Sequence, residues 1–511
     1  MMANDGLLCS LLQSHCPQLA RIGPDPVVIG ITDDSRLVRP GYLFVALQGW
    51  QQDGARFIDE ALSRGAVAVL QAEEARPYVV EAVPGVACLF HPQPRRALAI
   101  LAALFMGDPG RSLRLIAVTG TNGKTTTTFM LASILRQAGW SSGIIGTTGI
   151  VWPDGHVEPN AMTTPGPVQL QRCLHQMAAV GCQALTMEVS SHALDQQRVA
   201  GLCFETAIFT NLTRDHLDYH GSEEAYFAAK AKLFQKDQTR QAVLHLDDGW
   251  SERLMHICHH QNIPVLGYRL HRAALTTKEA AQATMALQLV GVSWQGLEVL
   301  LWHQGRSWPL SLPVAGLFNA TNAAAAAAAA YSLGIDPEYV VAGLAAASLP
   351  PGRMQMIQAG QPFTVAVDYA HTPDALERLL RSARELTPTG NKVIVVFGCG
   401  GERDRAKRPM MGRAATQWAD VAIITDDNPR SEMAAEIRRA ILQGAVAKGA
   451  VCHEIADRAQ AIALAITLAQ GNDVVLIAGK GHEQLQISLA GSTPFNDVQV
   501  ATAAITKLLG R

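Results

Sequence analysis

The segment 116–128, IAVTGTNGKTTTT, constrains the fold of this 511-residue chain more than any other part of the sequence. An apolar strand, Leu113–Thr119, runs into the glycine-rich loop 120–126, and a helical sequence, Thr125–Ala138, follows. Glycines allow a tight turn with inward N–H groups, and the helix N-terminus adds partial positive charge. Lys124 can reach the β- and γ-phosphates of a nucleotide, and the Thr125 hydroxyl can bind Mg²⁺. The loop residues predicted to bind ATP are Gly120, Thr121, Asn122, Gly123, Lys124, Thr125 and Thr126.

This loop lies inside a longer alternation of short apolar runs and amphipathic helical segments. Such alternation predicts right-handed βαβ units and parallel sheets. One Gly/Pro-rich break, MGDPGRSLR, ends near residue 112, and a second, Leu349–Gly352, follows an alanine-rich helix that contains Ala323–Ala330. We therefore expect an α/β protein of three domains, 1–112, 113–348 and 349–511. The central domain is expected to be a P-loop-type ATPase with a parallel sheet, and the C-terminal domain to be Rossmann-like.

Composition excludes several other classes of protein. The 42 Lys and Arg residues nearly balance the 44 Asp and Glu residues, so no global basic field would attract nucleic acid. Ala323–Ala330 is too short to span a bilayer, and the N-terminus lacks the pattern of a signal peptide. The nine cysteines are scattered without a CxxC pair. These features favour a reduced, cytoplasmic protein that binds neither nucleic acid nor membrane.

Three segments in the middle of the chain place polar residues next to apolar runs. They are ALTMEVSSH with Glu188, IFTNLTRDHLDYHG with His216, and YFAAKAKLF with Lys230. Phosphoryl transfer needs hard Mg²⁺ ligands and cations near the transferred phosphate, and Glu188 with Thr125 suits the metal. His216 is a less usual Mg²⁺ ligand, and by spacing alone a helix-capping or core histidine is the better interpretation.

Together with TGTNGKTTT, these segments resemble the motifs of the Mur ligase family, whose members form amide bonds through an acyl phosphate. The resemblance implies that Glu188 and His216 bind magnesium beside Thr125. It also implies that Lys230 is carbamylated and that its new carboxylate helps to hold a metal ion. A carbamate forms only on a neutral amine, so we expect Lys230 to lie in a poorly solvated pocket that lowers its pKa.

The resemblance continues across the second break. The segment GLFNATN is similar to the family's adenine-facing segment, which implies that Asn319 and Asn322 bind the adenine. Arg353, in PPGR, is expected to reach the terminal phosphate, although alone it could be a solvated charge. Asp368, in VDYAHTP, is expected to hold the ribose. Lys124, His216, Lys230 and Arg353 are thus the implied catalytic residues, and a hinged C-terminal domain is expected to close over ATP.

Three C-terminal segments each follow a predicted strand: FGCGGERDRAKRP, TDDNPRSE and AGKGHE. Ligands of open α/β sheets bind at the carboxyl ends of the strands. DNPR alone could be an Asx-Pro turn, but beside the other two segments it resembles the signature of family members that recognise meso-diaminopimelate. An arginine can grip the extra carboxylate of this amino acid bidentately, and acidic groups can meet its ammonium groups. The implied amino-acid site comprises Arg403, Asp427, Asn428, Pro429, Arg430, Gly479 and Glu483.

The N-terminal segment DDSRLVRPGYLFVALQG resembles the part of the family that holds the UDP end of the other substrate, and MTTPGP resembles a segment lining its peptide. Met162 stands where the family has an asparagine. The implied contacts with the UDP-dipeptide are Ser35, Trp50, Gln51, Gln52, Thr163, Thr164, Ser190, Gln196 and Arg198.

The resemblance therefore implies ATP, Mg²⁺, UDP-N-acetylmuramoyl-L-alanyl-D-glutamate and meso-diaminopimelate as the small molecules bound, and a monomeric ligase of cytoplasmic peptidoglycan precursor synthesis. Folylpolyglutamate synthetase shares the ATP loop, but the DNPR and DDSR segments disfavour it. A P-loop ATPase coupled to motion or transport would leave TRDHLDYH and DNPR unexplained. A catalytically inactive binding module is disfavoured because every catalytic position is filled.

Overall fold

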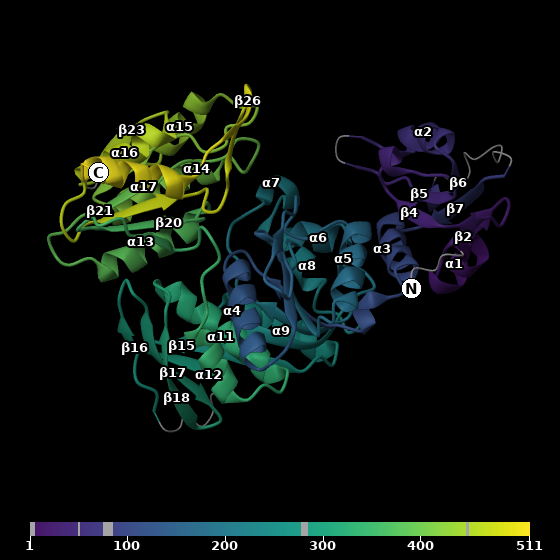
Figure 1. The fold of residues 1–511 in the computed structure, drawn as a ribbon, viewed down its shortest axis with the longest axis horizontal. Coiled ribbons are helices and arrows are strands. Elements are labelled where there is room, and N and C mark those ends of the chain that lie inside the picture. Colours follow the sequence, from purple (N-terminus) through teal and green to yellow (C-terminus); the bar gives the residue numbers. More distant parts are fainter. Residues whose placement is uncertain are drawn as a thin grey trace.

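The computed structural model describes residues 6–49, 52–74, 85–276, 279, 285–445 and 449–510. Trp50 and Gln51, two of the expected substrate contacts, lie outside these residues. Three α/β lobes follow one another along the chain, each around its own main sheet (Figure 1). The expected fold class, an α/β protein built from three such parts, is confirmed. No helix in the described segments is long and apolar enough to cross a bilayer.

The N-terminal lobe has a five-stranded sheet in the order β2-β7-β6-β5-β4. Its core side packs Leu43 and Leu70 against Leu98 and Leu101 of α3, while Phe44 and Ala61 pack on the other face. The elements are β1 (Leu7–Leu8), α1 (Cys9–His15), β2 (Ala20–Ile22), β3 (Val27–Val28), β4 (Gly30–Thr32), β5 (Tyr42–Val45), α2 (Ile58–Ser63), β6 (Ala66–Ala72), β7 (Ala87–His91) and α3 (Pro94–Phe105).

The central lobe contains an eleven-stranded sheet whose middle is parallel, as the alternation of strands and helices predicts. Its two edges are antiparallel: β11-β10-β9 on one side and β16-β17-β18 on the other, an addition that the sequence did not indicate. The strands are β8 (Arg114–Thr119), β9 (Ser142–Gly146), β10 (Gly149–Val151), β11 (Val157–Glu158), β12 (Ala184–Glu188), β13 (Phe204–Phe209), β14 (Thr239–His245), β15 (Val265–His271), β16 (Ala286–Val292), β17 (Leu297–His303) and β18 (Arg306–Leu312). The helices are α4 (Lys124–Gln137), α5 (Pro167–Ala179), α6 (Ser191–Asp195), α7 (Leu217–His220), α8 (Glu223–Ala231), α9 (Gly249–His260), α11 (Leu317–Ser332) and α12 (Pro337–Ala345).

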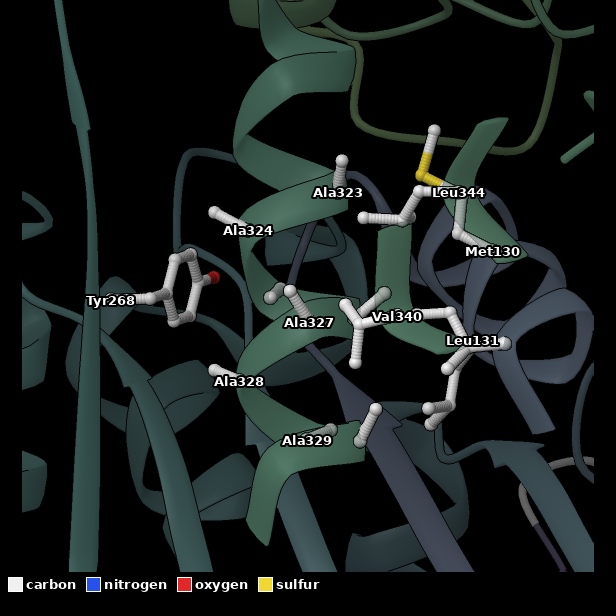
Figure 2. Packing of buried hydrophobic residues seen from close by; sticks show 14 of the residues in the cluster. Met130, Leu131, Tyr268, Ala323, Ala324, Ala327, Ala328, Ala329, Val340 and Leu344 are labelled. Atoms are coloured by element: carbon white, nitrogen blue, oxygen red, sulfur yellow. The ribbon is translucent and has the colours of Figure 1, made fainter. Parts of the chain in front are cut away.

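The alanine-rich run forms the buried middle of α11. All residues of Ala323–Ala330 are fully buried. Figure 2 shows the helix between Tyr268 of β15 on one side and Val340, Leu344 and Leu131 on the other. Because alanine ends at Cβ, α11 can approach both the sheet and its neighbouring helices closely. The expected closely packed helix is confirmed, and it fixes Asn322 at its N-terminal end beside the phosphate loop.

The C-terminal lobe is a six-stranded sheet in the order β19-β20-β24-β21-β22-β23, parallel except for β19. Apolar clusters on both faces pack against helices, which is the doubly wound arrangement expected. The elements are β19 (Gln355–Ile357), β20 (Thr364–Asp368), α13 (Pro373–Leu386), β21 (Val393–Phe397), α14 (Lys407–Trp418), β22 (Val421–Ile424), α15 (Ala434–Leu442), β23 (Val451–Glu454), α16 (Arg458–Leu468), β24 (Val474–Ala478), β25 (Leu485–Ser488), β26 (Gly491–Pro494) and α17 (Asp497–Leu508).

One detail of this lobe differs from the expectation. We expected the strand before AGKGHE to be the last strand of the chain. That strand, β24, is the last parallel strand, but the hairpin β25-β26 follows AGKGHE directly. The hairpin is hard to predict from the sequence, because its second strand, Gly491–Pro494, is exposed and consists largely of turn-forming residues. The hairpin matters for function because its first strand contacts the loop that carries DNPR.

Candidate active site

The phosphate loop joins the end of β8 to the start of α4 and has little room for side chains at its glycines. Gly120 has φ +145°, and a Cβ there would lie 1.9 Å from the Thr210 hydroxyl oxygen. Gly123 has φ +87°, and its Cβ would lie 2.3 Å from Oδ1 of Asn322. Both positions therefore require glycine, and the second brings the start of α11 against the loop.

Two lysines converge on the carbonyl oxygen of Gly120. Lys124 Nζ donates to this oxygen and to that of Thr121, each at 2.9 Å, and Lys230 Nζ donates to it at 2.9 Å. Burial lowers the pKa of both amines, and the charge of Lys124 lowers that of Lys230 further. Lys230 is 1% exposed and lies 4.5 Å from the ring of Tyr226. The expected poorly solvated pocket around Lys230, with a lowered pKa, is confirmed.

Hard oxygen donors lie at the same edge of the sheet. Glu188 ends β12, which pairs with β8, and its carboxylate accepts from the backbone N and the hydroxyl of Thr147 at 2.9 and 3.1 Å. Thr125 stands in the first turn of α4, where its hydroxyl accepts from Nη2 of Arg353 at 3.2 Å. The described parts of the chain hold no group of three or more His, Cys, Asp and Glu side chains arranged for a metal. Among the expected magnesium ligands, only Glu188 and His216 are of these four residue types; the other two are Thr125 and Lys230.

His216 lies at the N-terminal end of α7 in the left-handed conformation, with φ +54°. Its side chain makes no capping hydrogen bond, so the helix-capping interpretation fails. Nε2 lies 3.4 Å from a carboxylate oxygen of Asp215, yet burial lowers the pKa of the imidazole to about 3. Burial would raise the pKa of Asp215, but His216, His371 and Lys407 together lower it to about 2. His216 is thus neutral at pH 7, the form that binds metals.

A narrow pocket separates the phosphate loop from the C-terminal lobe, and Gly123, Thr126, Asn322, Arg353 and Asp368 are among its lining residues. The carboxylate of Asp368 accepts from the backbone N of Met354 and of Ala370, both at 2.8 Å. The pocket holds only 70 Å³, far less than the hundreds of Å³ typical of ligand sites. Entry of a nucleotide therefore requires the two lobes to separate.

The two expected adenine contacts are placed differently. Asn322 lines this pocket, whereas Asn319 does not. Asn319 is 1% exposed; its amide donates to the carbonyl of Ala315 at 2.7 Å and accepts from Nδ2 of Asn322 at 3.1 Å. Asn319 therefore fixes the orientation of Asn322, and its contact with the adenine stays a prediction.

Side chains join the central and C-terminal lobes around the pocket. Arg353 bonds to Thr125 and lies 4.4 Å from the ring of Tyr369, so it is not a freely solvated charge. Arg214, two residues before His216, pairs with Asp404 at 3.1 Å. Nδ2 of Asn122 donates to Asp374 at 3.2 Å. The phosphate loop thus contacts the C-terminal lobe directly, and the segment before His216 contacts the loop that carries Asp404.

The three C-terminal segments meet at the carboxyl ends of β21, β22 and β24, as predicted. Asn428 Nδ2 donates to Glu483 at 2.7 Å. Arg430, at φ +53°, donates through Nη1 to the carbonyl of Gly401 at 2.7 Å. Gly479 has φ +110°, and a Cβ there would lie 2.8 Å from a carboxylate oxygen of Asp427. Pro429 is buried beside Gly401, and Arg403 is exposed at the mouth of the site.

The expected contacts of the UDP-dipeptide form two groups. In the central lobe, the Thr164 hydroxyl donates to the carbonyl of Glu188 at 2.9 Å, and Arg198 bridges the carbonyl of Thr164 and the amide oxygen of Gln196, both at 2.7 Å. Ser190 caps α6 and its backbone N donates to Thr164, while the hydroxyl of Thr163 lies 3.2 Å from that of Thr147. In the N-terminal lobe, Ser35 donates to Glu60 at 2.7 Å, and Gln52 is exposed. Met162, in the central lobe before Thr163, is also exposed.

A cavity of 440 Å³ lies between these lobes, lined by residues that include Gln48, Arg95, Gln196, Tyr219 and His220. Arg95, Tyr219 and His220 were not among the predicted site residues, although Tyr219 and His220 belong to the LDYH segment that follows His216. Thr147 was not predicted either. It lies in the turn between β9 and β10, and its backbone N and hydroxyl donate to the Glu188 carboxylate. The polar LDYH segment next to His216 could have indicated Tyr219 and His220 as site residues. No motif in the sequence around Thr147 or Arg95 indicates a functional site.

Comparisons with known proteins agree with this geometry. Three family models match successive parts of the chain: "Mur ligase family, catalytic domain" over 27–106, "Mur ligase middle domain" over 118–330, and "Mur ligase, glutamate ligase domain" over 352–481. The chain is 43% identical over 490 residues to the UDP-N-acetylmuramoyl-L-alanyl-D-glutamate–2,6-diaminopimelate ligase of Geobacillus thermodenitrificans, covering 94% of this chain and 96% of that protein. It is 42% identical over 506 residues to the ligase of the same name from Xanthomonas campestris, with 98% of each covered.

Solved structures show the same fold. A structure of a ligase of that name superposes with a TM-score of 0.65 at 35% identity, over 94% of this chain and 96% of the other. MurF from Acinetobacter baumannii gives 0.63 at 20% identity over 98% of each chain. The folylpolyglutamate synthase of Mycobacterium tuberculosis gives 0.60 at 18% identity, over 82% and 95%. At such identities the last two likenesses show the fold alone. The fold and the phosphate loop define an ATP-using α/β ligase, and the chain belongs to the Mur ligase family.

Proposed function

We propose that this protein is an ATP-dependent ligase that adds meso-diaminopimelate to UDP-N-acetylmuramoyl-L-alanyl-D-glutamate. One observation carries the proposal: side chains at the phosphate loop and before His216 contact the C-terminal lobe, through Thr125–Arg353 and Arg214–Asp404, in a chain 43% identical over nearly its full length to a ligase of this name. The reaction belongs to the cytoplasmic synthesis of peptidoglycan precursors, and we propose that the protein acts there as a monomer.

The chemistry must overcome the poor electrophilicity of a carboxylate at pH 7. A carboxylate oxygen of the D-glutamyl residue attacks the γ-phosphorus of ATP, and ADP leaves. The amine of diaminopimelate then attacks the acyl carbon, loses a proton, and the tetrahedral intermediate releases inorganic phosphate. Lys124 and Arg353 bring positive charge to the transferred phosphate from the two lobes. Closure of these lobes excludes water, which would otherwise hydrolyse the acyl phosphate.

The residues at the edge of the central sheet fit magnesium. Thr125 offers a hydroxyl from the first turn of α4, Glu188 offers a carboxylate from the end of β12, and His216 is neutral. These residues, with carbamylated Lys230, would hold the metal, which neutralises phosphate charge when bound. The carbamate forms when the neutral amine of Lys230 attacks CO₂, making an N–C bond and releasing one proton. Burial of Lys230 supports this step because it lowers the pKa of the amine and so favours its neutral form.

The amino-acid site would bind both charged groups at the far end of diaminopimelate, the carboxylate and the ammonium group. Arg430 carries the cation for the carboxylate that lysine lacks, and Asp427 and Glu483 carry the charges for the ammonium groups. Thr163, Thr164, Ser190, Gln196 and Arg198 would line the peptide of the UDP substrate beside Glu188.

The proposal is tested by measuring phosphate release from ATP with the UDP-dipeptide and meso-diaminopimelate, L-lysine or no amino acid. We expect rapid release with diaminopimelate together with a product heavier by one diaminopimelate residue in mass spectra. Release at the same rate without any amino acid would instead indicate a plain ATPase, and equal use of lysine would refute the assigned amino-acid specificity.

A further inference from the structure

Lys480, the lysine of AGKGHE, is fully buried directly behind the amino-acid site. Its Nζ donates to the amide oxygen of Asn428 at 3.0 Å, to Oε2 of Glu483 at 3.1 Å, and to the carbonyl of Leu485 at 2.8 Å. An ammonium group has three donors, so these bonds occupy all of them. Lys480 therefore has no donor left for a substrate, and any effect it has on binding must pass through its partners.

Each partner is fixed in one orientation by this lysine. Oδ1 of Asn428 accepts from Lys480 and from the backbone N of Ile487 at 2.9 Å, so its Nδ2 must face Glu483. Both bonds to Glu483 use Oε2, and Oε1 accepts no hydrogen bond from the described residues. The Glu483 side chain is 33% exposed. Oε1 is thus left as the acceptor that a ligand ammonium group can reach.

We propose that Lys480 is a positioning residue for amino-acid recognition: it orients Asn428 and Glu483 so that one carboxylate oxygen meets an ammonium group of diaminopimelate. This inference rests on the proposed function and deepens it. A buried cation is costly unless every donor is satisfied. Here the three acceptors belong to the segments that enclose the amino-acid site, the D-N-P-R loop, the AGKGHE loop and the start of β25. The ammonium group of Lys480 therefore lies where its hydrogen bonds fix the side chains that contact the amino acid.

The test is steady-state kinetics and calorimetric binding of meso-diaminopimelate with Lys480→Met, which keeps the length of the side chain and removes its donors. We expect the KM and Kd for diaminopimelate to rise about 10- to 100-fold, the loss typical of a missing charge-assisted hydrogen-bond donor. The KM values for ATP and the UDP-dipeptide should stay within about twofold, because those substrates bind elsewhere. Lys480→Gln, whose amide keeps two N–H donors without the charge, should give an intermediate KM.

Two comparisons separate positioning from general stability. Asp473 is also buried in this lobe, directly before β24, where its carboxylate accepts from the backbone N of Lys392 at 2.8 Å and of Gln470 at 2.9 Å, so Asp473→Ala should lower the melting temperature without a selective rise in the KM for diaminopimelate. If Lys480 acts through Glu483, then Lys480→Met should change the KM much less in a Glu483→Gln background than in the wild type.

Several results would overturn the proposal. These are a uniform rise of all three KM values, additive effects in the cycle with Glu483→Gln, the same selective rise in Asp473→Ala, or failure of both Lys480 variants to fold. Wild-type turnover with diaminopimelate is measured first. Its absence would reject the proposed function itself, whereas its presence with an unchanged KM in Lys480→Met would reject only the role of Lys480.

Discussion

Replacing Lys230 with methionine should abolish ligase activity and yet stabilise the central lobe in CO₂-free buffer. The amine is 1% exposed, and burial, followed by the charge of Lys124, holds its pKa well below the ordinary lysine value. Methionine fills a similar volume without a group that must lose its proton on folding. A lysine that loses its proton on folding costs about 1.4 kcal/mol for each pH unit between its unfolded and its folded pKa, and methionine avoids this cost.

The sign and size of the effect depend on pH. An unfolded lysine is protonated below about pH 10.4, whereas folded Lys230 stays neutral down to its lowered pKa. Between these two pKa values the unfolded state binds one more proton, so wild-type stability rises with pH by up to about 1.4 kcal/mol per pH unit. Lys230→Met lacks this dependence. Its stability advantage should therefore grow by the same amount for each pH unit on going from about pH 10 towards 7.

The assay is urea unfolding of both proteins in CO₂-free buffers from pH 7 to 9.5, with the difference in unfolding free energy plotted against pH. Added bicarbonate with Mg²⁺ should then stabilise the wild type, because a carbamate forms only in its folded state, and should leave Lys230→Met unchanged. A difference that is flat across this pH range and does not respond to bicarbonate would mean that folded Lys230 keeps its proton, and the carbamate proposal would fail.

Substitutions at four further residues test other parts of the site. Lys124→Ala should lower kcat, measured by phosphate release, by about 100- to 1,000-fold or more through loss of a cation at the transferred phosphate; activity within threefold of wild type would contradict this role. Arg430→Ala should lower kcat/KM for diaminopimelate by about 30- to several-thousand-fold, from the roughly 2–5 kcal/mol cost of a stranded charge, and that for lysine much less; equal losses would reject its part in selectivity. Arg214→Asp and Asp404→Arg should each lower kcat by separating the lobes, and the double reversal should restore much of it; no recovery would show that their ion pair does not guide closure.

The sequence was sufficient for the buried parallel strands and the loops after them. Val474–Ala478 and Leu115–Val118 are continuous apolar runs, and such runs define strands covered on both faces. The antiparallel edge β16-β17-β18 was missed for a physical reason. Its strands are exposed in part, so their apolar signal is diluted, and β18 contains Pro309, which argues against a strand except at an edge. β18 is such an edge strand.

The motif residues of the site could be identified, but their supporting partners could not. Glu188 is held by Thr147, which is 41 residues away, and Arg214 is paired with Asp404, which is 190 residues away. Such pairs depend on how the lobes and strands are arranged, which no local pattern encodes. For Lys480 the residue type even misleads, because a lysine in a glycine-rich loop is expected to be solvated. Only the three acceptors around its Nζ explain why it is buried.

The acyl phosphate is the central claim of this account, and an oxygen-transfer experiment tests it most directly. The UDP-dipeptide is prepared with ¹⁸O in the D-glutamyl carboxylate and incubated with ATP, Mg²⁺ and meso-diaminopimelate, and the released phosphate is analysed by mass spectrometry. Because the carboxylate oxygen that attacks the γ-phosphorus leaves with that phosphorus, each phosphate should carry one ¹⁸O from the carboxylate. Unlabelled phosphate, released in equal amount with the tripeptide product, would show that the carboxylate is never phosphorylated and would contradict the proposed reaction.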